Sequence, residues 1–234
     1  SAAPTDSCSA MADNTDIVYS ENLTEKYPAS TWTPGNEINL DISVPLLQIK
    51  KAGNITKVNN YSIYLPSYTI GTSSYDSIER ICSPYGSKII AIGGKRAMEA
   101  AKPYLDLALE ASKLMISDYL WYGGEASYEN VEALSTHPLV QDADMIFAIG
   151  GGKALDTCKA LSIKLHKPIF TFPTIASTCA ACTTVSIMYR PDGSFIEPYF
   201  FDIPPVHTFI HTAILAAAPS KYLWAGIGDT YAKY

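Results

Sequence analysis

Residues 145–157 read MIFAIGGGKALDT, and this segment is the strongest indication of the fold class. The apolar run Met145–Ile149 predicts a buried strand, Gly150–Gly152 a turn, and Lys153–Leu165 an amphipathic helix. Glycines let the backbone approach a phosphate closely, and the N–H groups at the start of a helix offer it a partial positive charge. The stretch therefore predicts a phosphate-binding unit of unspecified ligand. The ligand is unspecified because the glycines match neither the dinucleotide fingerprint nor the P-loop. The alternative is a plain tight turn between strand and helix.

The same succession of short strand, turn and helix extends to both sides of this unit. We expect strands at residues 61–65, Lys88–Ile92, Asp118–Tyr122, Met145–Ile149 and Ile169–Phe172. We expect helices at Ser74–Cys82, Lys95–Leu114 with a break or restart at Pro103, Ser127–Ser135 and Lys153–Leu165. Strands that alternate with helices predict an α/β fold, a Rossmann-like parallel sheet with helices on both faces.

Two further glycine pairs, Gly93-Gly94 and Gly123-Gly124, also follow predicted strands. In an open parallel sheet, ligands bind at the carboxyl ends of the strands. Three glycine-terminated strands would therefore line one crevice, unless each pair only turns the chain. Beyond Pro173 the pattern changes, and residues 183–189 and 194–201 flank a turn sequence that predicts a β-hairpin.

Composition and periodicity divide the chain into three parts. Residues 1–58 are rich in Ser, Thr, Asn and Pro, and we interpret them as a leader or appendage whose role the sequence does not reveal. Residues 59–211 form the predicted nucleotide-binding α/β domain. Residues 212–234 are predicted to be helical.

Composition also narrows the classes of function. The chain has 234 residues, 47% of them hydrophobic, and a net charge of −6, which argues against a nucleic-acid partner. No apolar run approaches the roughly 20 residues that span a bilayer, and the N-terminus lacks the pattern of a signal peptide. Five unevenly spaced cysteines predict reduced thiols rather than a disulfide framework. We therefore expect a cytoplasmic protein with a small-molecule substrate and no membrane partner. These features are compatible with a homo-oligomer.

Four segments resemble, in order and in spacing, motifs of the iron-containing alcohol dehydrogenase and glycerol dehydrogenase-like family. The motifs include GGGKxxDxxK, PTxAST and GIGD, and they match Gly124–Ser127, Gly150–Lys159, Pro173–Thr178 and Gly226–Asp229. The resemblance implies an NAD(P)-dependent oxidoreductase. It also implies that the α/β domain is followed by an all-helical domain, of which residues 212–234 would be the start of a truncated copy.

The resemblance also implies which residues bind the cofactor. Gly150, Gly151, Gly152 and the following Lys153 and Asp156 would hold the pyrophosphate and its neighbourhood, and Thr174 and Ser177 would line the nicotinamide side. An NAD-selective site usually places an acidic residue on the ribose 2′-hydroxyl. Here that place holds Gly93 and Gly94, followed by Lys95 and Arg96. Because these cations could attract a 2′-phosphate, we expect NADP(H) rather than NAD(H).

The sequence departs from the family where a metal is bound. Cys179 stands where metal-dependent members have an aspartate ligand, and His211 stands where they have another aspartate. The Cys-Ala-Ala variant resembles the hydroxycarboxylate dehydrogenase branch, which implies a small 2-oxo or 2-hydroxy acid as substrate. The alternatives are a glycerol or polyol substrate, or a non-catalytic nucleotide-binding fragment. The family's metal-binding histidines belong to the helical domain, so we predict no catalytic metal in this chain and no appreciable activity from it alone; the catalytic residues stay unknown.

One further motif, Cys179-x-x-Cys182, has three interpretations. Together with His207 and His211 it could bind zinc. By itself it could be a redox pair. The third interpretation is that both cysteines are small packing residues.

Overall fold

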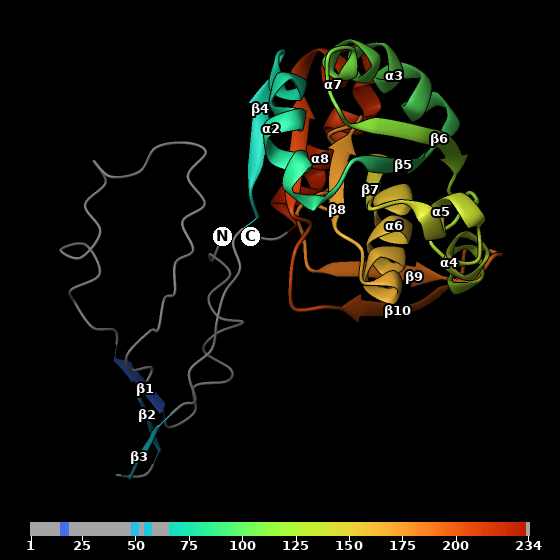
Figure 1. Cartoon of the computed structure of the whole chain (residues 1–234). Helices are drawn as coiled ribbons and strands as arrows, with labels where there is room; N and C mark the ends of the chain where they lie inside the picture. The colour runs from blue at the N-terminus through green and yellow to red at the C-terminus, as the bar shows by residue number, and fades with distance from the viewer. Residues whose placement is uncertain (1–14, 19–47, 52–53, 58–65, 233–234) are drawn as a thin grey trace. The chain divides into compact units, whose positions relative to one another are not determined.

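The computed structural model describes residues 15–18, 48–51, 54–57 and 66–232. The chain divides into two compact units, Ser1–Tyr64 with Tyr234, and Leu65–Lys233. In the first unit, three short strands form an antiparallel sheet in the order β1-β2-β3 (Figure 1): β1 (Thr15–Val18), β2 (Gln48–Lys51) and β3 (Asn54–Lys57). Most of the predicted appendage, and the strand predicted at residues 61–65, lie outside the described residues.

The second unit is built on a six-stranded sheet in the order β4-β11-β8-β7-β5-β6. Its strands are β4 (Tyr68–Gly71), β5 (Lys88–Gly93), β6 (Met115–Trp121), β7 (Met145–Gly150), β8 (Ile169–Pro173) and β11 (His207–His211). Every neighbouring pair is parallel, which confirms the predicted α/β sheet. Sequence patterns left β11 unassigned, and it lies between β4 and β8 although it is the last strand of the chain.

Helices cover both faces of this sheet (Figure 1). The helices are η3 (Ser74–Ser77), α2 (Ile78–Cys82), η4 (Ser83–Tyr85), α3 (Lys95–Leu109), α4 (Tyr128–Ser135), α5 (Pro138–Asp142), α6 (Gly152–Leu165), α7 (Thr212–Ala217) and α8 (Ser220–Tyr231). The predicted hairpin is confirmed as β9 (Val185–Tyr189) and β10 (Phe195–Phe200), which pair antiparallel. Strand β9 contacts α6, so the hairpin lies beside that helix.

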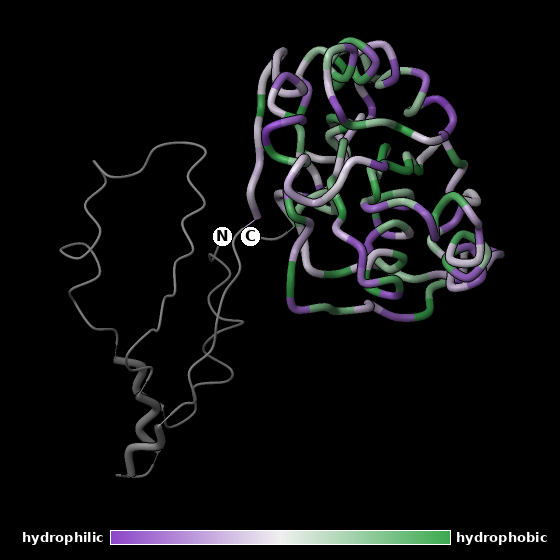
Figure 2. Tube along the Cα trace, in the orientation of Figure 1, coloured by the Kyte–Doolittle hydropathy of each residue, from purple (hydrophilic) through white to green (hydrophobic). Residues whose placement is uncertain are grey.

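The core consists of two apolar clusters, one on each face of the sheet. Side chains alternate along β7, so Phe147 and Ile149 join one cluster and Ile146 and Ala148 the other. Helices α2 and α3 contribute to the first cluster, while α4, α5 and α6 contribute to the second. The buried strands are accordingly among the hydrophobic segments in Figure 2. All side chains of β7 are buried, as expected for a central parallel strand.

Two predicted helix boundaries were wrong. Helix α3 continues through Pro103 and ends at Leu109 rather than at Leu114. Pro103 is exposed, so water can bind the carbonyl that lost its helical partner, while buried Ala101 and Leu105 hold the helix on the sheet. The helical C-terminal segment is divided at Ala218, whose extended conformation (ψ 152°) follows from the proline after it.

Candidate functional site

The strand order reverses direction between β5 and β7. From β5 the chain crosses to β6 on one side, and the next strand, β7, lies on the other side of β5. Such a switch point is where open α/β sheets bind ligands, at the carboxyl ends of the strands. Gly93 ends β5 and pairs with Ile149, and Gly150 ends β7. The structure therefore confirms that the glycine turn lies at the carboxyl end of a strand and brings the two glycine segments side by side.

Close backbone contact explains several of these glycines. A Cβ on Gly93 would lie 2.1 Å from the carbonyl oxygen of Ile149, and the Gly94 N–H donates a hydrogen bond of 3.2 Å to that same oxygen. Gly150 has a φ of 151°, which side chains rarely tolerate. The two turns are thus packed against each other with no room for side chains at Gly93.

Three of the segments that carry the family resemblance converge on this edge. A Cβ on Gly151 would lie 2.5 Å from the side chain of Ile175, and one on Gly226 would lie 2.0 Å from the carbonyl oxygen of Ala176. The Thr174 N–H donates to the carbonyl of Gly150 over 3.2 Å. Three segments therefore pack around one point: the glycine turn, the segment after β8 and helix α8. No local sequence pattern could predict this arrangement.

The N-terminus of α6 is open at the same point. Helix α6 begins at Gly152, and no side chain caps it. The first N–H groups of a helix have no partner within the helix, and together with the helix dipole they attract an anion. The space around Gly152 is less crowded, because a Cβ on this residue would lie 3.4 Å from its nearest neighbour, Thr178 Oγ1. The residues present therefore fit a pyrophosphate group.

Two lysines follow the glycine turns, Lys153 after Gly152 and Lys95 after Gly94, and they contact different partners. The Lys153 ammonium forms an ion pair of 2.6 Å with Glu125, and this hydrogen bond raises the pKa of Lys153. Lys95, at the start of α3, lies over the ring of Trp121 at 5.2 Å from its centroid. Lys95 and Arg96 are both exposed, and the first turn of α3 has no acidic residue. Sequence reasoning missed Trp121 and Thr178, whose relevance depends on contacts between segments far apart in the chain.

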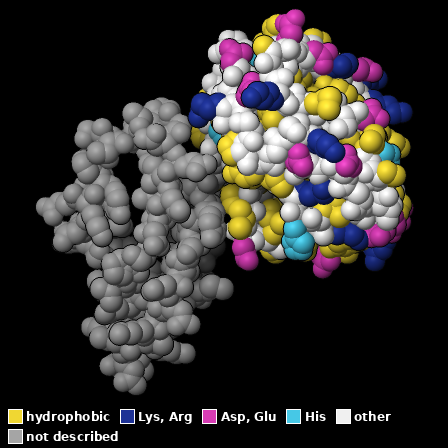
Figure 3. All heavy atoms as spheres, in the orientation of Figure 1, with side chains coloured by type: hydrophobic (Ala, Val, Ile, Leu, Met, Phe, Trp, Pro, Cys, Tyr) yellow, Lys and Arg dark blue, Asp and Glu magenta, His cyan; other side chains and the backbone are white. Residues whose placement is uncertain are grey.

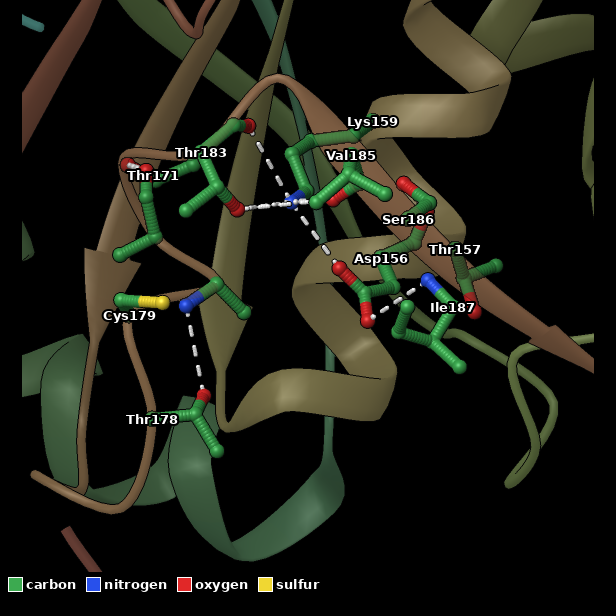
Figure 4. Close-up of polar contacts among 12 residues, drawn as sticks. Asp156, Thr157, Lys159, Thr171, Thr178, Cys179, Thr183, Val185, Ser186 and Ile187 are labelled. Atoms are coloured by element: carbon green, nitrogen blue, oxygen red, sulfur yellow. Dashed lines mark hydrogen bonds and ion pairs between the residues drawn. The ribbon is translucent and has the colours of Figure 1, made fainter. Parts of the chain in front are cut away.

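Asp156 and Lys159 form a buried ion pair of 2.9 Å in the second turn of α6 (Figure 4). Lys159 also donates to the carbonyl oxygen of Val185 at 2.5 Å and to Thr183 Oγ1 at 3.2 Å. Asp156 accepts a hydrogen bond from the backbone N–H of Ile187 at 3.3 Å. Burial raises the pKa of Asp156 and lowers that of Lys159, and their mutual attraction opposes both shifts. The Asp156 carboxylate thus contacts the start of the hairpin.

The zinc interpretation fails because its histidines have other partners. Both ring nitrogens of His207 are hydrogen-bonded, to Ser67 Oγ at 2.7 Å and Thr69 Oγ1 at 2.8 Å. Burial lowers the pKa of His207 to about 4. His211 lies between the rings of Tyr75 and Tyr104, at centroid distances of 4.9 and 4.2 Å.

Within the residues that the structure describes, no three His, Cys, Asp or Glu side chains gather as a metal site. Cys179 is exposed, so the interpretation of that cysteine as a packing residue was wrong.

The surface drawn in Figure 3 carries Lys and Arg interspersed with Asp and Glu. Among the helices of the described ranges, none is long and apolar enough to cross a membrane.

The chain matches known dehydrogenases. It is 43% identical over 113 residues to a glycerol dehydrogenase of Thermotoga maritima and 36% identical over 148 residues to hydroxycarboxylate dehydrogenase A of Escherichia coli. These matches cover 48% and 63% of this chain but 31% and 40% of the relatives. The crystal structure of a glycerol dehydrogenase from Schizosaccharomyces pombe superposes with a TM-score of 0.65 at 26% identity, over 74% of this chain and 44% of that chain.

This chain therefore spans less than half the length of these relatives. The family model for iron-containing alcohol dehydrogenases matches residues 66–202, which is more than half of the 234 residues. The glycine turns and the Thr174–Ser177 segment lie within that range, whereas Gly226 lies beyond it. The chain belongs to the iron-containing alcohol dehydrogenase family.

Proposed function

We propose that this chain is the nucleotide-binding half of an oxidoreductase that transfers a hydride between a nicotinamide cofactor and a small 2-oxo or 2-hydroxy acid. The observation that carries the proposal is the convergence of Gly150–Gly152, the Thr174–Ser177 segment and Gly226 at the carboxyl edge of the sheet. A site of backbone N–H groups without obstructing side chains suits a pyrophosphate better than it suits an uncharged ligand.

Each part of the edge would have its own task. The N–H groups around Gly151 and Gly152 would hold the pyrophosphate, with Lys153 beside them. Thr174 and Ser177 would face the nicotinamide side. The cofactor, when bound, supplies the hydride, and the protein positions its ring and excludes water. Asp156 would act indirectly, because its carboxylate holds the hairpin against α6.

Selectivity for NADP(H) is the second part of the proposal. The β5–α3 turn presents Gly93 and Gly94 and then the exposed cations Lys95 and Arg96. A carboxylate in that place would repel a 2′-phosphate, whereas an ammonium or guanidinium group attracts one.

The choice of substrate rests on Cys179. A carboxylate at this position would repel the carboxylate of a 2-oxo acid, and Cys179 removes that carboxylate. The similarity to hydroxycarboxylate dehydrogenase A, which extends over 63% of the chain, supports this choice. Glycerol is the second candidate substrate, supported by the 43% identity to the Thermotoga maritima relative.

A catalytic metal does not fit the residues present. Zinc or iron needs about three protein ligands and an open position, and the described ranges gather no such group. We expect residues 1–234 to bind NADP(H) without turnover of their own, and we expect turnover from a protein that also supplies the half of the relatives that this chain does not match.

The test has two stages. Residues 1–234 are titrated with NADPH and with NADH by calorimetry, and we expect saturable binding with the tighter constant for NADPH. A full-length protein is then assayed with 2-oxobutyrate and with glycerol. A preference for NADH would refute the cofactor assignment, and exclusive oxidation of glycerol would refute the substrate assignment. Steady turnover by residues 1–234 with about one equivalent of bound zinc or iron would refute the account of the metal.

A further inference from the structure

Cys179 and Cys182 occupy one tight turn in the loop after β8. The N–H of Cys182 donates to the carbonyl oxygen of Cys179 over 3.1 Å, and the Cys182 thiol lies 3.4 Å from the same oxygen. Residues that close a β-turn have Cα atoms within about 7 Å, and disulfides join Cα atoms about 4.4–6.8 Å apart. The Cα atoms of the two cysteines therefore lie at a separation that a disulfide can bridge.

Hydrogen bonds from two strands of the sheet hold this turn in place. The carbonyl oxygen of Ala181, between the two cysteines, accepts hydrogen bonds from the buried hydroxyls of Thr171 at 2.7 Å and Thr208 at 3.1 Å. Since Thr171 and Thr208 lie on β8 and β11, the sheet itself fixes the turn. Cys179 is nevertheless exposed and Cys182 partly exposed, so the turn lies at the surface, where small reagents can approach it.

The other described cysteines differ in this respect. Cys82 and Cys158 are fully buried. Burial raises the pKa of both thiols, which suppresses the reactive thiolate. Oxidation in the described part of the chain should therefore be confined to the turn after β8.

A buried cation lies close to the turn. Lys159 donates to the carbonyl oxygen of Thr183, the residue after Cys182, at 3.4 Å and to its Oγ1 at 3.2 Å (Figure 4). The backbone on both sides of Cys182 is thus held in place. Position and access favour thiol–disulfide exchange at Cys179 and Cys182.

We propose that Cys179 and Cys182 form a reversible dithiol–disulfide site that reacts with small-molecule disulfides. One thiolate attacks the small disulfide, forms a mixed disulfide and releases one small thiol. The second thiolate then attacks the protein sulfur of that mixed disulfide and releases the second small thiol. The two protein thiols are oxidised to one disulfide, and the small disulfide is reduced to two thiols.

The site is linked to the candidate cofactor crevice. Thr178 precedes Cys179, and its Oγ1 accepts a hydrogen bond from the N–H of Ala180 at 3.3 Å while facing Gly152. Closing the disulfide would fix this stretch of backbone. The oxidised and reduced forms should therefore differ in NADPH affinity, whereas disulfide formation itself does not depend on the proposed function.

The test is peptide mapping of residues 1–234 after dialysis against a chelator. The protein is treated with oxidised glutathione, alkylated in its native state and digested with trypsin. Trypsin does not cleave the Lys167–Pro168 or Arg190–Pro191 bonds, so the tryptic peptide Leu165–Lys221 contains Cys179 and Cys182 but neither Cys82 nor Cys158. We expect this peptide to escape alkylation and to weigh two hydrogens less than the reduced form, and dithiothreitol should reverse both changes.

A variant traps the intermediate. Cys182→Ser should stop at the mixed disulfide and carry one glutathione on Cys179, while the matched control Cys82→Ser should still form the disulfide. The proposal is overturned if the wild-type peptide remains alkylated at both cysteines, or if it carries two separate glutathione adducts. Since the wild-type result does not depend on any variant, a misfolded variant leaves the test decisive.

Discussion

The carboxyl edge of the sheet and the buried polar groups of the domain are built on opposite principles. At the edge, Gly93 and Gly150–Gly152 have no side chains, and the start of α6 has no side-chain cap. The buried groups, Asp156 and Lys159 on α6 and His207 on β11, instead pair with one another or with other groups of the protein. We therefore expect changes at the buried groups to lower stability and changes at the edge to lower cofactor affinity.

The largest effect is expected for Lys159→Met. It leaves the Asp156 carboxylate buried without its cation, and breaking a buried ion pair costs about 3–5 kcal/mol. Urea unfolding should show this loss of free energy of unfolding. The matched control is Lys153→Met, because Lys153 is 55% exposed and its ion pair is worth about 0–1 kcal/mol.

A double variant tests the same ion pair. Replacing both charges, as in Asp156→Leu with Lys159→Met, removes the uncompensated charge and should recover most of the stability. Equal losses for Lys159→Met and Lys153→Met would show that the buried ion pair contributes no more to stability than the exposed one.

The second prediction concerns pH and His207. Its pKa is lowered to about 4 by burial and, to a smaller extent, by Arg80, compared with about 6.5 for a histidine in an unfolded chain. The unfolded state therefore binds more protons between these values. Stability is complete above about pH 6.5 and falls as the pH drops to about 4, by at most about 3 kcal/mol.

The measurement is the free energy of unfolding of the wild type and of His207→Gln across this range. Glutamine keeps hydrogen-bonding groups for Ser67 and Thr69 but has no proton to take up. The difference between the two curves should grow as the pH falls. Parallel curves would mean that His207 does not titrate in this way.

Sequence patterns predicted most of the sheet because its central strands are short apolar runs ended by glycine, as in Met145–Gly150. They also found the glycine turn. They did not place β11, because five residues that include two histidines carry no periodicity of their own. They treated Asp156 as part of the phosphate site, since a motif gives no direction for a side chain; the carboxylate contacts Lys159 and Ile187.

The third prediction concerns Gly152 at the carboxyl edge of the sheet. Gly152→Ala adds a methyl group where the N-terminus of α6 should meet the pyrophosphate, and we expect NADPH affinity to fall about tenfold, or about 1.4 kcal/mol. Stability should not fall, because neighbouring atoms leave 3.4 Å for the new Cβ and alanine suits a helix better than glycine. Unchanged affinity in calorimetry would place the pyrophosphate elsewhere. Gly93→Ala is the contrasting variant, since its Cβ meets the Ile149 carbonyl and should destabilise the fold.

The smallest effect is expected for Lys95→Met. Loss of one exposed cation near the 2′-phosphate should weaken NADPH binding by about 1 kcal/mol and leave NADH binding unchanged. The matched control is Lys102→Met on the same helix, because Lys102 lies over Tyr119 at 4.8 Å just as Lys95 lies over Trp121. If both variants lower NADPH affinity equally, the effect is one of general charge and not of a 2′-phosphate site.

The most direct test of the central claim is hydrogen–deuterium exchange of residues 1–234 with and without saturating NADPH. The claim is that the carboxyl edge binds the dinucleotide through its backbone N–H groups. The account predicts slower exchange in three segments, at residues 93–96, 150–155 and 174–178, and little change around the Asp156–Lys159 partners at residues 183–187. Slower exchange at the opposite edge of the sheet, or no change at residues 150–155 despite binding, would contradict it.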